Sequence, residues 1–400
     1  MPESTTTSTV DDSVAGRSVS GAPIELAHVT KRYAGQQAPA VDDFSMHINA
    51  GEIVVFVGPS GCGKTTTMKM INRLIEPSAG RIMLGDQDVT KLEPAQLRRR
   101  IGYAIQQVGL FPHMTIAQNI GQVPAMLKWD RQRIRARVDE MLELTGLDPD
   151  AYRGRFPRQL SGGQQQRVGV ARALAADPPV LLMDEPFGAV DPITRGNLQD
   201  ELLNLQSQLG KTIVFVTHDF DEAIKLGDRI AVLGNQSKIL QYDTPEAILA
   251  APADDTVAGF VGSGATIRQL GLKRVHHLQL GKVATAPLGV DAEAARQTLG
   301  GGKHLLLLDK RNRPVEWLSA RALAKATGSV QHGDHLVGDT VTRRSTLVDA
   351  LDAILTEGGG YAAVTGERGE YVGTVQMEQI MATITEIREA QDTTPTGSAG

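Results

Sequence analysis

The sequence GPSGCGKTT at residues 58–66 decides how the chain folds, because such a loop needs a strand before it and a helix after it. The apolar run 53–57 precedes it and the helix-compatible run 68–74 follows it. Glycines let the backbone curl so that its N–H groups and the helix N-terminus hold phosphate anions. Lys64 adds a positive charge for the phosphates, and the hydroxyl of Thr65 suits Mg²⁺. A tight turn alone would not explain this Gly/Lys/Thr spacing.

Composition narrows the class of protein. The 400 residues predict two or three domains, and 41% apolar with 22% charged residues is typical of a globular protein. A net charge of −5 gives no reason to expect nucleic acid as a partner. The single cysteine, Cys62, excludes an intrachain disulfide and fits a reducing compartment. No apolar run approaches the roughly 20 residues of a membrane helix, so we expect membrane association only through a partner.

Two carboxylates follow a second apolar run, at 179–183. Asp184 suits Mg²⁺ as the acidic partner of a phosphate loop. Glu185, one residue further, suits the polarisation of an attacking water. Adjacent acids at a strand end also occur in solvated turns, but the phosphate loop upstream favours the catalytic interpretation.

Two more predicted core strands end in polar residues. The run 101–105 ends at Gln106, and the run 212–216 leads to His218. Because α/β proteins place ligand-facing residues at strand C-termini, we expect Gln106 at the site and His218 against the terminal phosphate. A lone histidine is usually structural, and its place in the same parallel sheet is what favours the phosphate contact.

A second potential phosphate site lies at 160–167, with the sequence LSGGQQQR. Ser161 is a candidate helix N-cap, and Gly162 and Gly163 expose backbone N–H groups at the positive end of the helix dipole. A capped helix would explain Ser161 but not the paired glycines before Gln164.

The N-terminal part predicts an accessory antiparallel sheet from three short strands, at 24–29, 41–48 and 81–84. Tyr33 precedes the phosphate loop in sequence, and an exposed aromatic ring there suits stacking on a nucleotide base. An ordinary loop tyrosine is the alternative. Residues 115–176 are predicted to be mostly helical.

A weak internal repeat occupies the C-terminal part, because residues 305–311 align with 362–368 at an offset of 57 positions. Each copy is predicted to read helix, strand, charged hairpin turn, strand, helix. One copy would leave a sheet face uncovered, so the copies should pack together.

The predicted organisation is therefore α/β throughout. A P-loop NTPase core carries an antiparallel β subdomain and a helical subdomain, and an α/β tandem module follows. The predicted parts are a disordered tail (1–22), a nucleotide-binding unit (23–251, helical subdomain about 107–176), a linker (252–265), repeat 1 (266–328), repeat 2 (329–387) and a disordered tail (388–400).

The order of these motifs resembles that of ABC-transporter ATPase subunits over about residues 24–250, and Ser-Gly-Gly-Gln is the distinguishing mark of that family. The resemblance implies an ATPase that works as a head-to-tail homodimer, with each ATP between one loop 58–66 and the other subunit's Ser161–Gly163. It implies adenine stacking on Tyr33 and places Asp191 in the turn that this family often writes Ser-Ala-Leu-Asp, here Gly-Ala-Val-Asp. Gln106 would sense both Mg²⁺ or water and the membrane partner.

The tandem repeat resembles a pair of CBS domains, and an ABC ATPase with a CBS pair looks like the subunit of glycine betaine/carnitine/choline importers. Residues 105–115, IQQVGLFPHMT, also resemble that subgroup. One departure concerns the CBS pair, because nucleotide-binding copies carry Ser/Thr-x-x-Asp after the last strand. Here that position reads SARA at 319–322 and QMEQ at 376–379, without the aspartate.

We therefore expect an ATP hydrolase that couples ATP and Mg²⁺ to the import of quaternary-amine compatible solutes. Its expected partners are a second copy, membrane permease subunits and, indirectly, an extracytoplasmic substrate-binding protein, at the cytoplasmic face of the cell membrane. The expected catalytic residues are Lys64, Gln106, Glu185 and His218. Those for the metal are Thr65, Gln106 and Asp184, and those for ATP are Tyr33, Gly58, Pro59, Ser60, Gly61, Cys62, Gly63, Lys64, Thr65, Thr66 and, from the other copy, Ser161, Gly162, Gly163 and Gln164.

Three alternatives remain open. One is an importer for another small solute, such as an amino acid, against which the CBS-like pair argues. Another is a non-transport ABC ATPase acting on DNA or ribosomes, against which the single cassette and the absence of a basic stretch argue. The third is a regulatory sensor with secondary ATP turnover. Cys62 inside the loop is also expected to react with maleimide, with MgATP as protectant.

Overall fold

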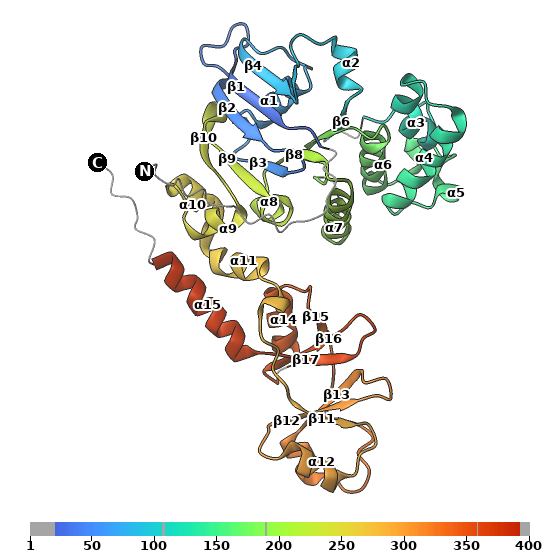
Figure 1. Ribbon diagram of the computed structural model, residues 1–400, viewed down its shortest axis with the longest axis vertical. Helices are drawn as coiled ribbons and strands as arrows, with labels where there is room; N and C mark the ends of the chain where they lie inside the picture. Colours follow the sequence, from blue (N-terminus) through green and yellow to red (C-terminus); the bar gives the residue numbers. More distant parts are fainter. Residues whose placement is uncertain (1–20, 106–108, 189, 358, 393–400) are drawn as a thin grey trace, which may run out of the picture. The chain divides into compact units, whose positions relative to one another are not determined.

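The computed structural model describes residues 21–105, 109–188, 190–357 and 359–392 (Figure 1). Contacts divide the chain into two compact units, Met1–Pro245 and Glu246–Gly400. The predicted end of the nucleotide-binding unit, residue 251, lies six residues after the boundary between these units. Among the described residues, no helix is both long enough and apolar enough to cross a membrane.

A six-stranded sheet forms the centre of the first unit, in the order β10-β9-β3-β8-β7-β6. Five strands are parallel, and three of them, β3, β7 and β8, are buried along their whole length, as expected for strands covered on both faces. A last strand at 228–234 was predicted, whereas the structure adds β10, antiparallel to β9. The strands are β3 (Ile53–Val57), β6 (Ile101–Ala104), β7 (Val180–Asp184), β8 (Thr212–Thr217), β9 (Arg229–Leu233) and β10 (Ile239–Asp243).

The accessory antiparallel sheet is confirmed, with the order β2-β1-β4-β5. Its inward residues pack with those of the central sheet in one apolar core, in which the rings of Phe44 and Phe56 meet edge to face with centroids 6.1 Å apart. The strands are β1 (Ile24–Lys31), β2 (Val41–Ile48), β4 (Ala79–Leu84) and β5 (Gln87–Asp88).

The helical part predicted for about 107–176 is a cluster of helices beside the sheets, which Figure 1 shows in teal and green. Its members are α3 (Ile116–Met126), α4 (Arg131–Leu144), α5 (Pro149–Tyr152) and α6 (Gly162–Leu174). The other helices before α9 are α1 (Lys64–Ile71), α2 (Pro94–Arg98), α7 (Pro192–Leu209) and α8 (Phe220–Leu226).

The second unit contains two small sheets, ordered β11-β12-β13-β14 and β15-β16-β17. The repeat keeps its 57-residue offset, because β12 and β16 start at His304 and Tyr361, and each copy reads helix-strand-strand-helix. Trp317 and Tyr361, from different copies, stack with ring centroids 6.1 Å apart, so the copies share a core. The strands are β11 (Ala284–Pro287), β12 (His304–Leu308), β13 (Pro314–Ser319), β14 (His335–Leu336), β15 (Val341–Thr342), β16 (Tyr361–Thr365) and β17 (Tyr371–Gln376).

Two helices extend into segments predicted as a linker and as a disordered tail. The predicted linker 252–265 contains α10, and α15 covers residues 388–392 of the predicted tail. Asp254 caps α10 by accepting a hydrogen bond from the Val257 N–H, a signal that the glycines of this segment obscured. The helices of this unit are α9 (Pro245–Ala250), α10 (Asp255–Val261), α11 (Ala265–Leu272), α12 (Ala292–Leu299), α13 (Ala320–Lys325), α14 (Leu347–Glu357) and α15 (Met377–Asp392).

Substituting alanine for glycine is expected to have opposite effects on the free energy of unfolding at two positions. A Cβ at Gly102 in β6 would collide with the Ala173 carbonyl and the Leu181 side chain, whereas at Gly196 in α7 it would meet nothing within 4 Å. We expect Gly102→Ala to lower the free energy of unfolding by about 1–3 kcal/mol and Gly196→Ala to raise it by about 0.5–1 kcal/mol. Urea unfolding followed by circular dichroism measures both, and a Gly102→Ala protein as stable as the parent would contradict this packing.

Candidate functional site

The loop 58–66 lies at the carboxyl edge of the central sheet, between β3 and α1. Gly63 caps α1 in a left-handed conformation with φ of +114°, and Gly61 has φ of +80°. A Cβ at Gly63 would also collide with the Ser237 hydroxyl and crowd the Ala40 carbonyl. Only glycine fits there, which explains the glycine that precedes Lys64.

Lys64 is almost fully buried inside this curl, with 6% of the residue exposed. Its Nζ donates to the carbonyl oxygens of Gly58 at 2.7 Å and Pro59 at 2.9 Å. The ammonium is thus held within the loop, where a phosphate oxygen can take the place of a carbonyl at small cost in hydrogen bonds.

Thr65 and Asp184 meet at the same edge, as predicted for a metal pair. The Thr65 hydroxyl donates to Asp184 Oδ1 at 3.0 Å, and Asp184 is 8% exposed. Burial raises the pKa of the Asp184 carboxyl; the Thr65 hydrogen bond opposes this rise, and the charge of Glu185 adds to it.

These two oxygen donors fit Mg²⁺, which prefers oxygen ligands and is usually bound by one or two protein groups together with substrate phosphates. Within the described residues, no group of three or more His, Cys, Asp or Glu side chains could hold a metal ion by itself. The geometry therefore fits a metal whose ligands come partly from the protein and partly from the phosphates of a nucleotide.

Glu185 and His218 also converge, although they come from different strands. His218 Nδ1 lies 3.2 Å from Glu185 Oε1, and the His218 side chain is 65% exposed against 21% for Glu185. Glu185 adopts a left-handed φ of +46°, and its N–H donates to the Val216 carbonyl at 3.0 Å. Such a backbone is unusual for a residue with a side chain, and the strand β8 holds it in place.

Tyr33 shares a cavity with the loop. The cavity measures about 620 Å³, and its lining includes Tyr33, Gly61, Asn235 and Gln236. Lys31 Nζ lies 5.1 Å from the centre of the Tyr33 ring. The ring is partly exposed beside the phosphate loop, which is the placement that base stacking requires.

Ser237, which the sequence did not predict as a site residue, forms hydrogen bonds with the phosphate loop 58–66. The Ser237 N–H donates to the Cys62 carbonyl at 2.6 Å, and its hydroxyl lies 3.2 Å from that of Thr67. Ser237 is fully buried. No local signal marks it, because the contact joins residues 175 positions apart.

The expected reactivity of Cys62 conflicts with its position. The residue is only 1% exposed, and its sulfur lies 3.8 Å from Lys64 Nζ. A thiol that a maleimide does not reach reacts slowly, so this conformation argues against ready labelling of Cys62, and protection by MgATP stays a prediction.

The signature segment, residues 161–164, begins α6 as predicted. Ser161 accepts a hydrogen bond from the Gln164 N–H at 3.3 Å while the Gln164 side chain accepts from the Ser161 N–H at 3.0 Å, a complete capping box. A Cβ at Gly162 would meet nothing within 4 Å, so this turn is open on one side. Among the hydrogen bonds of the described residues, none joins this segment to the loop 58–66.

The remaining predicted residues divide into two cases. Asp191 caps α7 by accepting a hydrogen bond from the Thr194 N–H at 3.0 Å, and this bond lowers the pKa of its carboxyl. Gln106 lies outside the described residues.

Comparison with known proteins agrees with this geometry. Residues 41–188 match the family model described as ABC transporter. The chain is 45% identical over 361 residues to the glycine betaine/carnitine/choline transport ATP-binding protein OpuCA of Bacillus subtilis (88% of this chain, 93% of the relative). It is 41% identical to the osmoprotectant import ATP-binding protein OsmV of Salmonella typhimurium (89% and 95%). A solved dimer of the cassette MJ0796 bound to ADP and Pi matches with 34% identity and a TM-score of 0.51 (56% of this chain, 98% of that one).

The burial of Asp184 predicts a conflict between stability and function. A carboxyl whose pKa is raised in the fold favours folding when protonated, and this contribution is lost as pH rises and the carboxylate ionises. Without nucleotide or Mg²⁺ at neutral pH, we expect Asp184→Asn to raise Tm by roughly 2–4 °C, about 1 kcal/mol.

Differential scanning fluorimetry with and without MgATP tests this. The gain should shrink as pH is lowered and the parent carboxyl takes up its proton, and MgATP should stabilise the parent but not the variant. A lower Tm for the variant at neutral pH would contradict the assignment.

Proposed function

The chain belongs to the ABC transporter family, and we propose that it is the energy-coupling ATPase subunit of an importer for quaternary-amine compatible solutes. The observation that carries the solute class is the length of the match. Relatives named for glycine betaine, carnitine and choline transport align with this chain through both units, over 88% of its residues. The cassette hydrolyses ATP, as expected for its family.

Phosphate binding and charge stabilisation come from the loop. Backbone N–H groups of the loop and the Lys64 ammonium face the place where negative charge grows during phosphoryl transfer, which is the main catalytic lever for this reaction. Mg²⁺, held by Thr65 and Asp184 with the phosphates, would neutralise charge on the terminal phosphates.

Glu185 is the proposed general base. Its carboxylate accepts the proton of the attacking water, and His218, 3.2 Å away, orients the carboxylate and contacts the terminal phosphate. The left-handed backbone at Glu185 fixes the direction of its side chain, which is useful because a general base must lie within hydrogen-bond reach of the water.

A second copy of the chain completes the site. The open glycines at the start of α6 offer N–H groups at the positive end of a helix, and such a position suits the phosphates of an ATP held by the other copy. The dimeric state of the cassette MJ0796 supports this arrangement.

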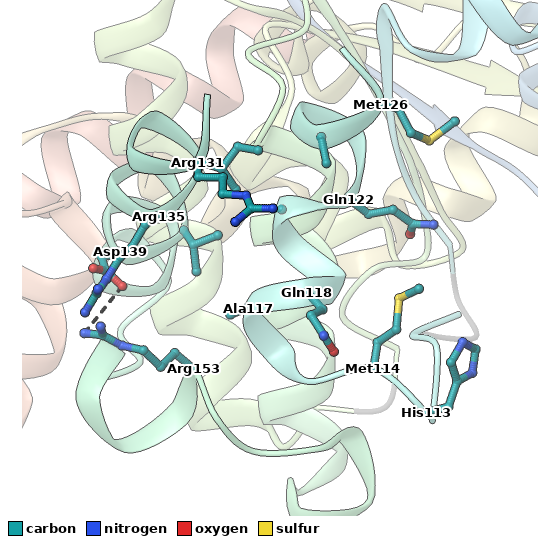
Figure 2. A pocket seen from close by; sticks show the side chains of 14 residues that line it. His113, Met114, Ala117, Gln118, Gln122, Met126, Arg131, Arg135, Asp139 and Arg153 are labelled. Atoms are coloured by element: carbon teal, nitrogen blue, oxygen red, sulfur yellow. Dashed lines mark ion pairs between the residues drawn. The ribbon is translucent and has the colours of Figure 1, made fainter. Parts of the chain in front are cut away.

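A permease subunit is the proposed occupant of a groove on the helical part, which we call the permease groove (Figure 2). The groove measures about 830 Å³, and α3 and α4 supply most of its lining. Met114 and Met126 lie on one side of it and Arg131 and Arg135 on the other. Methionines adapt to an apolar partner, and the arginines suit the polar end of a short helix. The substrate-binding protein would then act only through the permease, with the chain at the cytoplasmic face of the membrane.

The C-terminal unit is proposed to regulate transport. It contains the two CBS-like copies, while the described residues assigned to ATP all lie in the first unit. The hairpin turn of its first copy carries exposed cations, Lys310, Arg311 and Arg313, whose contacts weaken as salt shortens the Debye length from roughly 10 Å at 0.1 M to 3 Å at 1 M.

The catalytic assignment predicts a hydrolysis-deficient variant. Glu185→Gln removes the proton acceptor but keeps the size of the side chain, so ATP binding should persist while turnover falls by roughly 10²–10⁴-fold. Phosphate release measures turnover, and size-exclusion chromatography with MgATP should reveal a trapped dimer. Near-normal turnover would remove Glu185 from this role.

Uptake by the reconstituted transporter tests the solute and the regulatory role together. With the permease and binding protein in liposomes, we expect ATP-driven uptake of radiolabelled glycine betaine that unlabelled choline or carnitine inhibits and amino acids do not. A chain truncated at Gly264 should keep uptake but lose its dependence on internal salt. Uptake of an amino acid instead would favour the alternative importer. A truncated chain that folds and assembles but lacks ATPase activity would show that the C-terminal unit is required for ATP hydrolysis.

A further inference from the structure

Residues 109–115, which we call the connecting segment, join the central sheet to α3. Gly109 has a left-handed φ of +54° and turns the chain at the start of this segment. His113 and Met114 line the permease groove, while Gly109 and Phe111 line a second cavity of about 340 Å³. The position of this segment therefore shapes the surface that we assign to the permease.

One fully buried side chain holds most of the segment. Asn119 of α3 is 0% exposed and accepts a hydrogen bond from the Phe111 N–H at 2.8 Å. Its Nδ2 lies 3.2 Å from the carbonyl oxygens of Phe111 and Met114 and 3.0 Å from that of Thr115, so three acceptors share its two N–H groups. A buried amide that is satisfied this completely ties the segment to α3.

An arginine from another helix holds the start of the segment. Arg172 Nη1 donates to the Gly109 carbonyl at 2.7 Å, and burial lowers the pKa of the guanidinium. Arg172 belongs to α6, the helix that begins at the signature segment, and it lies 11 residues after Ser161. At 1.5 Å per residue, these two residues are about 16 Å apart along one rigid helix.

We propose that Arg172 and Asn119 are positioning residues that force the connecting segment to move with α6 when ATP draws the signature segment toward its phosphates. The inference rests on the proposed function. A displacement at the N-terminus of α6 is then delivered at Gly109 through Arg172 and spread over residues 111–115 by Asn119. The displacement caused by ATP binding thereby moves His113 and Met114, which line the permease groove.

The chain offers a direct probe of this movement. Cys62 is its only cysteine and is 1% exposed, while His113 is exposed, so His113→Cys creates a single accessible thiol. We would label it with an environment-sensitive fluorophore in a Glu185→Gln background, which retains ATP. MgATP should change the emission of this labelled parent without any permease present.

The test compares three substitutions in the labelled parent. Arg172→Lys keeps the charge but shortens and narrows the donor, and Asn119→Asp keeps the shape but loses both N–H donors. Each should form the ATP dimer on size-exclusion chromatography while its emission change falls at least about threefold. Arg137→Lys is the matched control, because Arg137 donates to the carbonyls of Leu174 and Ala175 at 3.0 and 3.1 Å and touches no residue of the segment through these bonds.

Several results would overturn the inference. A full emission change in both Arg172→Lys and Asn119→Asp would do so, and so would an equal loss in Arg137→Lys, which would reflect general loosening of the helical part. A parent that forms the ATP dimer without any emission change would refute the inference and leave the proposed function standing. A parent that binds no ATP would instead refute the proposed function.

Discussion

The parallel pairing of β3, β8 and β7 is the constraint on which the rest of the structure depends. In this register Val57 lies opposite Thr217 and Asp184 opposite Val216, so the three strands end at one level. Because parallel strands point the same way, the residues that follow them share one edge. The loop 58–66, the two carboxylates and His218 therefore meet, although up to 160 residues separate them in the chain.

Charged side chains are concentrated at this edge of the sheet, although burying a charge is normally unfavourable in a folded protein. Lys64 and Asp184 are both nearly buried, and each is satisfied by neighbours that an incoming nucleotide can replace or complement. A buried charge normally destabilises a fold unless it is paired and hydrogen-bonded. These buried charges lower the free energy of unfolding of the ligand-free protein, but they allow strong interactions with phosphate and metal. The left-handed backbone at Glu185 lowers the free energy of unfolding further.

In the proposed function, the helical part has a different role, which is to pass a movement caused by ATP binding to the permease. Its helices pack on one another, and the buried Asn119 and the partly buried Arg172 tie residues 109–115 to α3 and α6. An irregular segment normally loosens a structure, but one whose carbonyls are bound by Asn119 and Arg172 has few ways to move alone. The second unit uses repetition instead, since each small sheet is covered by the other copy.

The α/β class, the five parallel strands of the central sheet and the capping of α6 could be read from the sequence alone, because each depends on local periodicity or a fixed spacing; the same spacing selected the candidate site residues, whose roles stay predictions. Other features required the tertiary structure. The support of the loop by Ser237, the burial of Cys62 and the hydrogen bonds of Asn119 and Arg172 all involve partners distant in sequence or a backbone path that no pattern encodes. Strand β10 and helix α10 were missed because both are short, and a short element is stabilised by its neighbours more than by its own residues. Propensity and spacing are local, whereas burial and hydrogen-bond partners are decided only when distant segments pack together.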